Sequence, residues 1–238
     1  MTLDASASAL DTRRFGRRIC RATVETAADV AALEALAARE GIEMVIARTI
    51  TANTKAVHAL EASGHRLMDA LVYWGGSLAD AAPMPDGVRL ATIADRATLG
   101  ALAREGFTTY AGGHYHEDER LDPALVTAGY VEWCETSLDK ADHEVWVTED
   151  DAGALTGFLS LRRGEPADMV LNAVAERARG RGVYRRLVQA AMASARAHGS
   201  RDIVVSTHLL NVTPQRVWAR AGLLPKHSLY TFHKWYAP

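Results

Sequence analysis

Strand-like apolar runs alternate with helix-like amphipathic stretches along most of the chain. Beyond residue 87 the pattern predicts strands at 88–95, 143–149, 154–162, 168–175, 202–208 and 228–236, and helices at 96–105, 123–138, 182–198 and 213–221. Before residue 79 it predicts strands at 17–24, 43–49 and 67–74 and helices at 27–39 and 54–63. The alternation indicates an α/β or α+β fold.

The clearest break in the pattern is the segment 79–87, which is rich in Ala, Pro, Asp and Gly. We therefore expect four parts: a flexible terminus at 1–14, a small unit at 15–78, a linker at 79–87 and a larger domain at 88–238. A unit as small as 15–78 has little core of its own, so we expect it to pack its sheet against the larger domain. There it can shape a pocket or a dimer interface, and a homodimer is an open expectation.

Three residues of the small unit recur at one fixed distance. Gly41, Asn53 and Gly64 are followed 158 residues later by Gly199, Asn211 and Gly222, each at the same place relative to a predicted helix or strand end. Helix ends and turns favour Gly and Asn in any case, which is the alternative explanation. We favour a degenerate first copy of the second unit, one that has a strand-like sequence at 19–24 where the second has a glycine turn at 177–182.

Composition narrows the function classes. The chain has 238 residues, 48% hydrophobic and 24% charged, with a formal net charge of −2, so no basic surface for nucleic acid or membrane is predicted. Only Cys20 and Cys134 are present, which argues against a disulfide framework or a structural zinc site. Neither an apolar leader nor a run of 18 apolar residues occurs, so we expect a cytoplasmic protein.

The glycine turn Arg177-Ala178-Arg179-Gly180-Arg181-Gly182 stands between a predicted strand and a long amphipathic helix. Glycines let successive amides face one concavity, and the helix N-terminus adds partial positive charge, so the turn can bind a pyrophosphate without a metal. The alternative is a solvated Arg-Gly turn. The turn, the strand ending near Asn211 and the helix from Thr213 through Trp218 to Gly222 together resemble the GNAT acetyltransferase superfamily over 88–238.

The resemblance implies a GNAT fold, in which helices flank a mixed central sheet, with 88–238 as the catalytic domain and 15–78 as a smaller half-GNAT-like unit. It also implies acetyl-CoA as co-substrate, with its pyrophosphate on the turn and its pantetheine arm between the strands 168–175 and 202–208. The cofactor residues expected from it are Ala173, Val174, Ala175, Arg177, Arg179, Gly180, Arg181, Gly182, Val183, Asn211 and Trp218. Asn211 either steadies the pantetheine or caps the following helix.

Within the superfamily, several features resemble acetyltransferases of nucleotide-linked amino sugars, such as the TDP-fucosamine type. They are the small N-terminal unit, the segment His114-Tyr115-His116 and the closing strand around Tyr230. This implies an amino-sugar amine as acceptor, with His114, Tyr115, His116, Arg162 and Arg163 as substrate residues. Two histidines alone lack a third ligand, so no metal is expected.

The catalytic groups are less clear from sequence. In many GNATs the acid for the departing thiolate is a Tyr seven residues after the Asn, but that position is Trp218 here, and an indole N–H is too weak an acid. Tyr230 is the nearest phenol in the following sequence, although strand alternation can also place it on a packed face. Tyr184 is expected to pack rather than react.

For the base, the candidates are His208, His233 and His116, with Glu165 and Asp168 as weaker carboxylate alternatives. Two further functions remain open: the same chemistry on another small amine, such as an aminoglycoside, amino acid or polyamine, and a non-catalytic acyl-CoA-binding role.

Overall fold

Within residues 3–236, ten strands form one mixed sheet in the order β1-β2-β3-β10-β4-β9-β8-β7-β6-β5. The computed structural model describes residues 3–236. The strands are β1 (Asp4–Ala7), β2 (Ile19–Thr23), β3 (Met44–Ile50), β4 (Arg66–Ser77), β5 (Val88–Leu90), β6 (His143–Glu149), β7 (Leu155–Arg162), β8 (Ala167–Val174), β9 (Asp202–His208) and β10 (Leu224–Trp235). The helices are α1 (Ala9–Phe15), α2 (Ala27–Glu40), α3 (Thr54–Ala62), α4 (Arg96–Thr108), α5 (Pro123–Thr136), α6 (Val183–Ala197) and α7 (Val212–Arg220), with short 3₁₀ turns at Ile93–Asp95, Ser137–Asp139 and Glu176–Ala178.

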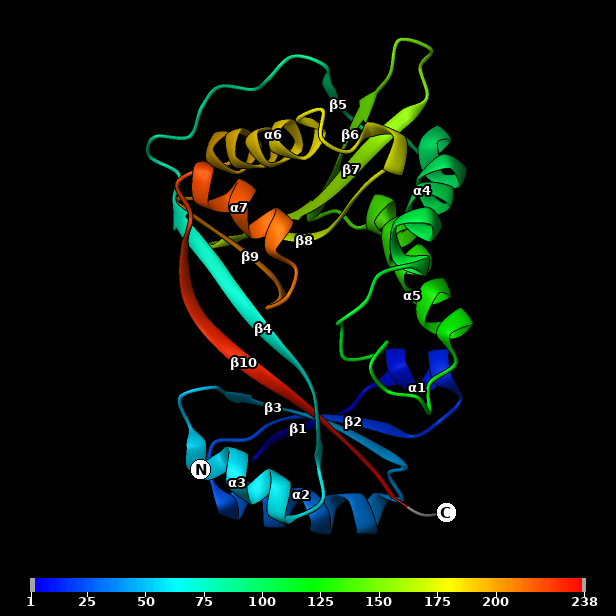
Figure 1. The fold of residues 1–238 in the computed structure, drawn as a ribbon, viewed down its shortest axis with the longest axis vertical. Coiled ribbons are helices and arrows are strands. Elements are labelled where there is room, and N and C mark those ends of the chain that lie inside the picture. The colour runs from blue at the N-terminus through cyan, green and yellow to red at the C-terminus, as the bar shows by residue number, and fades with distance from the viewer. Residues whose placement is uncertain (1–2, 237–238) are drawn as a thin grey trace.

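The two longest strands, β4 and β10, connect the halves of the molecule. β4 follows α3 in the chain but pairs with β9, whereas β10 follows α7 but pairs with β3. The two strands also pair with each other, and they run side by side between the N-terminal half and the C-terminal half (Figure 1). We expected the halves to pack separate sheets together. Instead, each half completes the sheet of the other.

The offset of 158 residues is present in the structure. β3 begins at Met44 and β9 at Asp202, and the bounds of α3 and β4, moved by the same offset, are those of α7 and β10. Pairing keeps the offset too: Leu71 of β4 faces His208, and Leu229 of β10 faces Ile50. The predicted offset between Gly41, Asn53 and Gly64 and their later counterparts is therefore also the offset between corresponding helices and strands.

Residues 3–14, expected to be flexible, are instead part of the sheet and its covering layer. β1 pairs with β2, and α1 packs on α5, where Arg14 donates to the Gly129 carbonyl at 3.1 Å. The Asp11 carboxylate has no exposed surface and accepts hydrogen bonds from Arg21 Nε and the Tyr115 hydroxyl, both at 2.6 Å. Polar side chains hold this segment in place. The sequence predicted a flexible end because its residues are small and polar. Residues 1–2 of that expected terminus lie outside the described residues.

The strand expected at 88–95 is shorter than predicted. Only Val88–Leu90 pairs with β6, and a 3₁₀ turn follows at Ile93–Asp95. The reason is local, because the Asp95 carboxylate accepts a hydrogen bond from the Thr92 amide at 2.7 Å and binds Arg89. The segment 79–87 contains neither strand nor helix, although the sheet continues across both sides of it.

Helix α6 packs on the sheet next to the glycine turn. Its buried face includes Leu187, Val188 and Ala191. Gly157 of β7 permits this close approach, because a Cβ at that position would lie 2.8 Å from Val183 Cγ1. The start of α6 is thereby held close over β7. None of the helices within 3–236 is long and apolar enough to span a bilayer.

Candidate active site

The two central parallel strands of the C-terminal half separate along their length. β8 pairs with β9 only from Ala167 to Met169. Its register with β7 shifts between Ser160 and Leu161, which leaves Val170 as an extra residue on β8. Such a bulge bends the strand that carries it, and here it marks the point where β8 leaves β9.

Beyond the bulge, β8 keeps its bonds to β7 on one side only. The Ala175 amide donates to the Thr156 carbonyl at 2.9 Å. Because backbone groups alternate along an antiparallel pair, those of Asn172 and Val174 point away from β7, into the gap. The gap thus offers unpaired backbone donors and acceptors. Ala175 does not, because its amide is used and its side chain is fully buried.

The glycine turn closes one end of this gap. Gly180 and Gly182 both have φ of 76°, a left-handed conformation that other residues adopt only with strain. Gly182 is the N-cap of α6 and provides no side-chain cap, so the first amides of the helix stay free for an anion.

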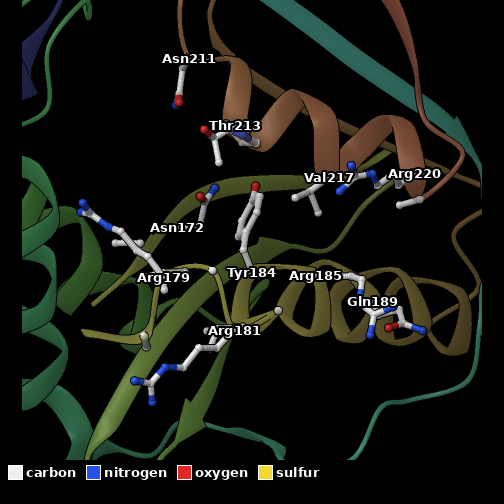
Figure 2. A pocket seen from close by; sticks show the side chains of 18 of the residues that line it. Asn172, Arg179, Arg181, Tyr184, Arg185, Gln189, Asn211, Thr213, Val217 and Arg220 are labelled. Carbon is white, nitrogen blue, oxygen red and sulfur yellow. The ribbon is translucent and has the colours of Figure 1, made fainter. Parts of the chain in front are cut away.

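A cleft of about 1080 Å³ extends from this turn along the gap, and we call it the cofactor cleft. From the predicted set Ala173, Val174, Arg179, Gly180, Arg181, Gly182, Val183 and Asn211 line it. Arg185 and Arg220 add positive charge from α6 and α7, on opposite sides of the opening (Figure 2). Arg177 was expected here, but it does not line the cleft. Its guanidinium donates to the Leu155 carbonyl at 2.8 Å and pairs with Asp150.

Asn211 occupies the N-cap position of α7 without acting as a cap. It accepts no hydrogen bond from the first helix amides, and its Nδ2 donates to Thr207 Oγ1 at 3.0 Å. Figure 2 shows the side chain pointing into the cleft. Of the two roles left open by the sequence, the helix cap is therefore wrong for Asn211.

Trp218 is buried and lies beside a phenol. Its Nε1 donates to the Tyr184 hydroxyl at 2.8 Å, so the indole N–H is engaged and does not face the cofactor cleft. Tyr184 rises from the first turn of α6 towards α7 (Figure 2), and burial raises its pKa. The hydroxyl proton of Tyr184 is not needed for the bond with Trp218. Tyr184, expected only to pack, thus lines the cofactor cleft.

A second cleft, of about 780 Å³, opens on the other side of the gap, and we call it the acceptor cleft. Five residues line both clefts: Phe107, Tyr110, Asn172, Asn211 and Pro214. The two spaces therefore meet between β8 and β9. A group that lies in the junction is reachable from both sides.

The predicted substrate segment is divided by the structure. His114 and Tyr115 line the acceptor cleft, but the Tyr115 hydroxyl is bound to Asp11 and Arg21. His116 does not line it. Its ring stacks on Tyr130, with ring centroids 5.8 Å apart.

The two strand-end arginines also differ. Arg162 lines the acceptor cleft and pairs with Asp168, which lines it as well, at 2.8 Å. Arg163 does not line it and donates to the Ala141 carbonyl instead. Glu165 lies outside both clefts and binds the Arg201 amide at 2.7 Å. Arg163 and Glu165 thus hold neighbouring loops.

Of the predicted catalytic residues, His208 lies at the junction end of β9. Its ring is 7% exposed, lines the acceptor cleft and stands 5.1 Å from the Tyr110 ring in an edge contact. Burial lowers the pKa of His208, more than the carboxylates of Asp69 and Glu117 raise it. Nδ1 of this imidazole has no hydrogen-bond partner within the described residues. That nitrogen is enclosed, so the ring can meet a ligand only through its other edge, and the lowered pKa favours its neutral form.

Tyr230, expected as an acid, lies away from both clefts. It packs against the buried cluster of the N-terminal half, with its ring 6.4 Å from Phe232. Alternation along β10 turns Tyr230 and Phe232 to the α2–α3 side, whereas His233 faces the other way. His233 is almost fully buried and is held by Asp118 and His114. It does not line either cleft.

Two residues at the site were missed by the sequence analysis. Tyr110 lines both clefts, and burial raises its pKa. Asp69 of β4 lines the acceptor cleft, is 7% exposed and accepts a hydrogen bond from the His114 amide at 3.0 Å. Burial also raises the pKa of the Asp69 carboxyl. The only signal for Tyr110 was its position just before the Gly112-Gly113 turn. Nothing in the sequence indicated Asp69.

Comparisons with known proteins identify a family and similar folds. Residues 106–223 match the model of the acetyltransferase (GNAT) family. A GCN5-related N-acetyltransferase from Sphaerobacter thermophilus is similar in fold, with a TM-score of 0.67, 16% identity, and coverage of 98% of this chain and 76% of that one. A functionally unknown conserved protein from Staphylococcus epidermidis ATCC 12228 has a TM-score of 0.68 at 10% identity, over 100% of this chain and 93% of its own.

A tandem GNAT protein from the clavulanic acid biosynthesis pathway is also similar, with a TM-score of 0.61 and 15% identity over 94% of this chain and 77% of that one. No curated protein matches the sequence significantly. Within residues 3–236, no three His, Cys, Asp or Glu side chains are grouped so as to hold a metal ion.

Proposed function

Residues 106–223 form an acetyltransferase domain of the GNAT family, and from this premise we propose that the protein acetylates a primary amine held in the acceptor cleft. The observation that carries the proposal is the junction of the two clefts between β8 and β9. An acyl group presented from the cofactor cleft and an amine presented from the acceptor cleft meet there. Holding two reactants in this way is itself a large part of catalysis.

The cofactor cleft has the chemistry that coenzyme A needs. Free amides at the start of α6, together with Arg179 and Arg181, suit a pyrophosphate. The unpaired backbone groups of Asn172 and Val174 suit the amides of a pantetheine arm. Acetyl-CoA bound there supplies an activated acyl carbonyl. We therefore assign the cofactor role to the gap, the turn and Asn211.

The transfer requires two proton movements. The nitrogen of a neutral amine forms a bond to the acetyl carbon, and the bond from that carbon to sulfur breaks. One proton leaves the nitrogen and one reaches the departing sulfur. We assign the first to His208, which lines the acceptor cleft at the end of β9, and the second to Tyr110, which lines both clefts.

The acceptor in our proposal is an amino sugar that is linked to a nucleotide. Six cationic side chains line the acceptor cleft against three carboxylates. The cations are Arg13, Arg14, Arg21, Arg48, Lys140 and Arg162, and the carboxylates are Asp69, Glu132 and Asp168. Arg48 has no ion pair with any residue of 3–236, and its Nε is buried without a partner. This charge suits an acceptor that carries an anionic group, such as a nucleoside diphosphate, and disfavours a polyamine.

A thiol-release assay tests the proposal, with acetyl-CoA and a panel of nucleoside-diphosphate amino sugars, aminoglycosides, amino acids and polyamines. We expect release with a nucleotide-linked amino sugar and a higher KM for that acceptor in Arg48→Gln. Arg39→Gln, an exposed arginine of α2, is the matched control. Release only with another amine class contradicts the acceptor assignment. If coenzyme A binds but no amine in the panel causes thiol release, the proposed transferase activity is contradicted and a non-catalytic role is favoured.

A further inference from the structure

A chain of hydrogen bonds leads from a buried carboxylate to the acceptor cleft. Asp118 Oδ2 lies 2.7 Å from His233 Nδ1, and His233 Nε2 lies 2.9 Å from His114 Nδ1. The side chain of His233 has no exposed surface and that of Asp118 has 5%. We call Asp118, His233 and His114 the histidine relay. It joins the α4–α5 loop to β10.

The partners of Asp118 fix the direction of the relay. Trp235 Nε1 donates to Oδ2 at 2.8 Å and the Arg120 amide donates to Oδ1 at 3.1 Å, so both oxygens act as acceptors. His233 must therefore carry its proton on Nδ1. Our proposal requires a neutral His233, whose Nε2 is then bare and accepts from His114 Nδ1–H. In that arrangement the bare nitrogen of His114 is Nε2.

That nitrogen is the one that opens to the cleft. The His114 ring lines the acceptor cleft. Among the described residues, its Nε2 has no hydrogen-bond partner and is not enclosed by protein atoms. The surroundings keep the ring neutral: burial lowers the pKa of His114 well below its usual value, and the positive charges of Arg48 and Arg21 lower it further. Asp69 faces the same loop but accepts from the His114 amide, not from its ring. A ring held neutral is a poor base and a good hydrogen-bond acceptor.

We propose that His114 is a specificity residue whose Nε2 accepts a hydrogen bond from a hydroxyl group of the acceptor, with His233 and Asp118 as positioning residues. This rests on the proposed function and sharpens it, because it requires a hydroxylated amine. The unpaired guanidinium of Arg48 supplies the complementary donor for an anionic group of the same molecule. Nucleotide-linked amino sugars carry both groups, whereas polyamines carry neither.

Burial of the His114 ring sets the size of the expected effect. A site built to accept a hydrogen bond is left unsatisfied when the ligand lacks the donor, which costs about 1–3 kcal/mol, or roughly 5- to 150-fold in kcat/KM. An acceptor that lacks the hydroxyl should therefore be used less well by about that factor. Because the penalty is paid on binding, it should appear in KM rather than in kcat.

The first test does not depend on any acceptor. Ring ¹⁵N NMR of the whole protein at pH 7 should show both His114 and His233 as neutral rings protonated at Nδ1. Exposed His227, on β10, serves as the internal comparison. An Nε2–H on His114, which a charged His233 would impose, overturns the proposal.

The second test uses a nucleoside-diphosphate aminohexose and its deoxy analogues, each lacking one hydroxyl. One analogue should lose roughly 5- to 150-fold in kcat/KM with the wild type. The loss should be nearly abolished in His114→Phe, which keeps a ring beside Tyr115, and reduced in Asp118→Asn. His227→Phe should leave it unchanged. Equal use of every deoxy analogue by the wild type overturns the proposal.

The two arms separate the possible failures. If no amine of any class is acetylated while the rings show the expected protonation, the proposed function fails and the relay stands as a binding group. If transfer occurs but the rings are protonated at Nε2, the proposed function stands and the relay assignment fails. Acetyl-CoA affinity, measured in each variant, should not change, because no relay residue lines the cofactor cleft.

Discussion

The N-terminal and C-terminal halves use the same order of elements, yet their pairs of parallel strands differ. In the first half the two strands stay paired, and in the second half they separate. β2 stays paired with β3 from Ile19 to Thr23, whereas β8 leaves β9 after Met169. Between strand and helix the first half has only residues 24–26, and the second has 175–182. The capacity for a cofactor therefore comes from a bulge and a longer turn, not from the fold as such.

The equivalent asparagines show the same contrast. Asn53 accepts a hydrogen bond from the Ala56 amide at 3.2 Å and caps α3, whereas Asn211 makes no cap and faces the cleft. One position thus stabilises a helix in the first half and is free for a ligand in the second. The first half contributes instead through its strand β4, which places Asp69 in the acceptor cleft.

We expect the largest effect when the second half is given the short strand-to-helix connection of the first half. Replacing Ala175–Gly182 by Val-Glu-Thr should weaken acetyl-CoA binding by at least about 100-fold, roughly 2.7 kcal/mol, because the turn amides and the arginines are lost. Calorimetric titration measures it, and circular dichroism checks the fold. Inserting the longer turn in place of residues 24–26 is the reciprocal control and should create no second site. Retained affinity in the shortened protein contradicts the account.

A single phenol should have the next largest effect. Tyr110→Phe should lower kcat by about 10²-fold, because the proton for the departing sulfur is lost, while acetyl-CoA affinity changes little. Tyr130→Phe is the matched control, since Tyr130 lines only the acceptor cleft. Steady-state kinetics with saturating acceptor distinguishes them. Equal losses in the two variants would remove Tyr110 from its assigned role.

The two asparagines offer a paired test of smaller size. Asn53→Ala should cost about 1 kcal/mol in the free energy of unfolding, as expected for a lost N-cap, and leave acetyl-CoA affinity unchanged. Asn211→Ala should weaken acetyl-CoA by roughly tenfold, about 1.4 kcal/mol, with little change in unfolding. Urea unfolding and calorimetry give both quantities. The reversed pattern would mean that the roles have been exchanged.

The smallest expected effect concerns pH and only the N-terminal half. Burial lowers the pKa of His65 to about 4, although Glu34 opposes the shift. A depressed pKa means that the unfolded chain binds the proton first, so stability falls as the pH drops from the usual value near 6.5 towards 4. His65→Leu should reduce this dependence in urea unfolding at pH 7 and pH 5, whereas exposed His58→Leu should not. Parallel slopes in all three proteins would contradict it.

Much of the fold could be predicted because local signals agree. Glycines at helix ends and the 158-residue offset located α3, α7 and the strands that flank them. Strand exchange could not be predicted, since pairing β10 with β3 joins residues more than 170 positions apart and no local pattern records it. The N-terminal segment was misjudged for a similar reason. Asp11 is ordered by Arg21 and Tyr115, which come from other elements.

In the candidate site, too, residues with a local sequence signal were predicted, and residues placed by distant contacts were not. The glycine turn is a local feature, so Arg179 to Val183 were found, but Arg177 points to the β6–β7 hairpin, a contact outside its own segment. The position of Tyr230 could not be predicted, because the sequence does not show which face of β10 packs against which half. Tyr110 and Asp69 reach the site only through the packing of a loop and a strand from distant parts of the chain. Their roles depend on tertiary structure alone.

The most direct test of the account is the stoichiometry of acetyl-CoA binding, measured by calorimetric titration of the whole protein. We predict one site per chain, lost when the turn at 175–182 is shortened, because only the second half separates its strands. Two sites per chain would show that the first half also binds the cofactor, and one site that survives the shortened turn would place it elsewhere. Either result would show that the bulge and the glycine turn do not make the site.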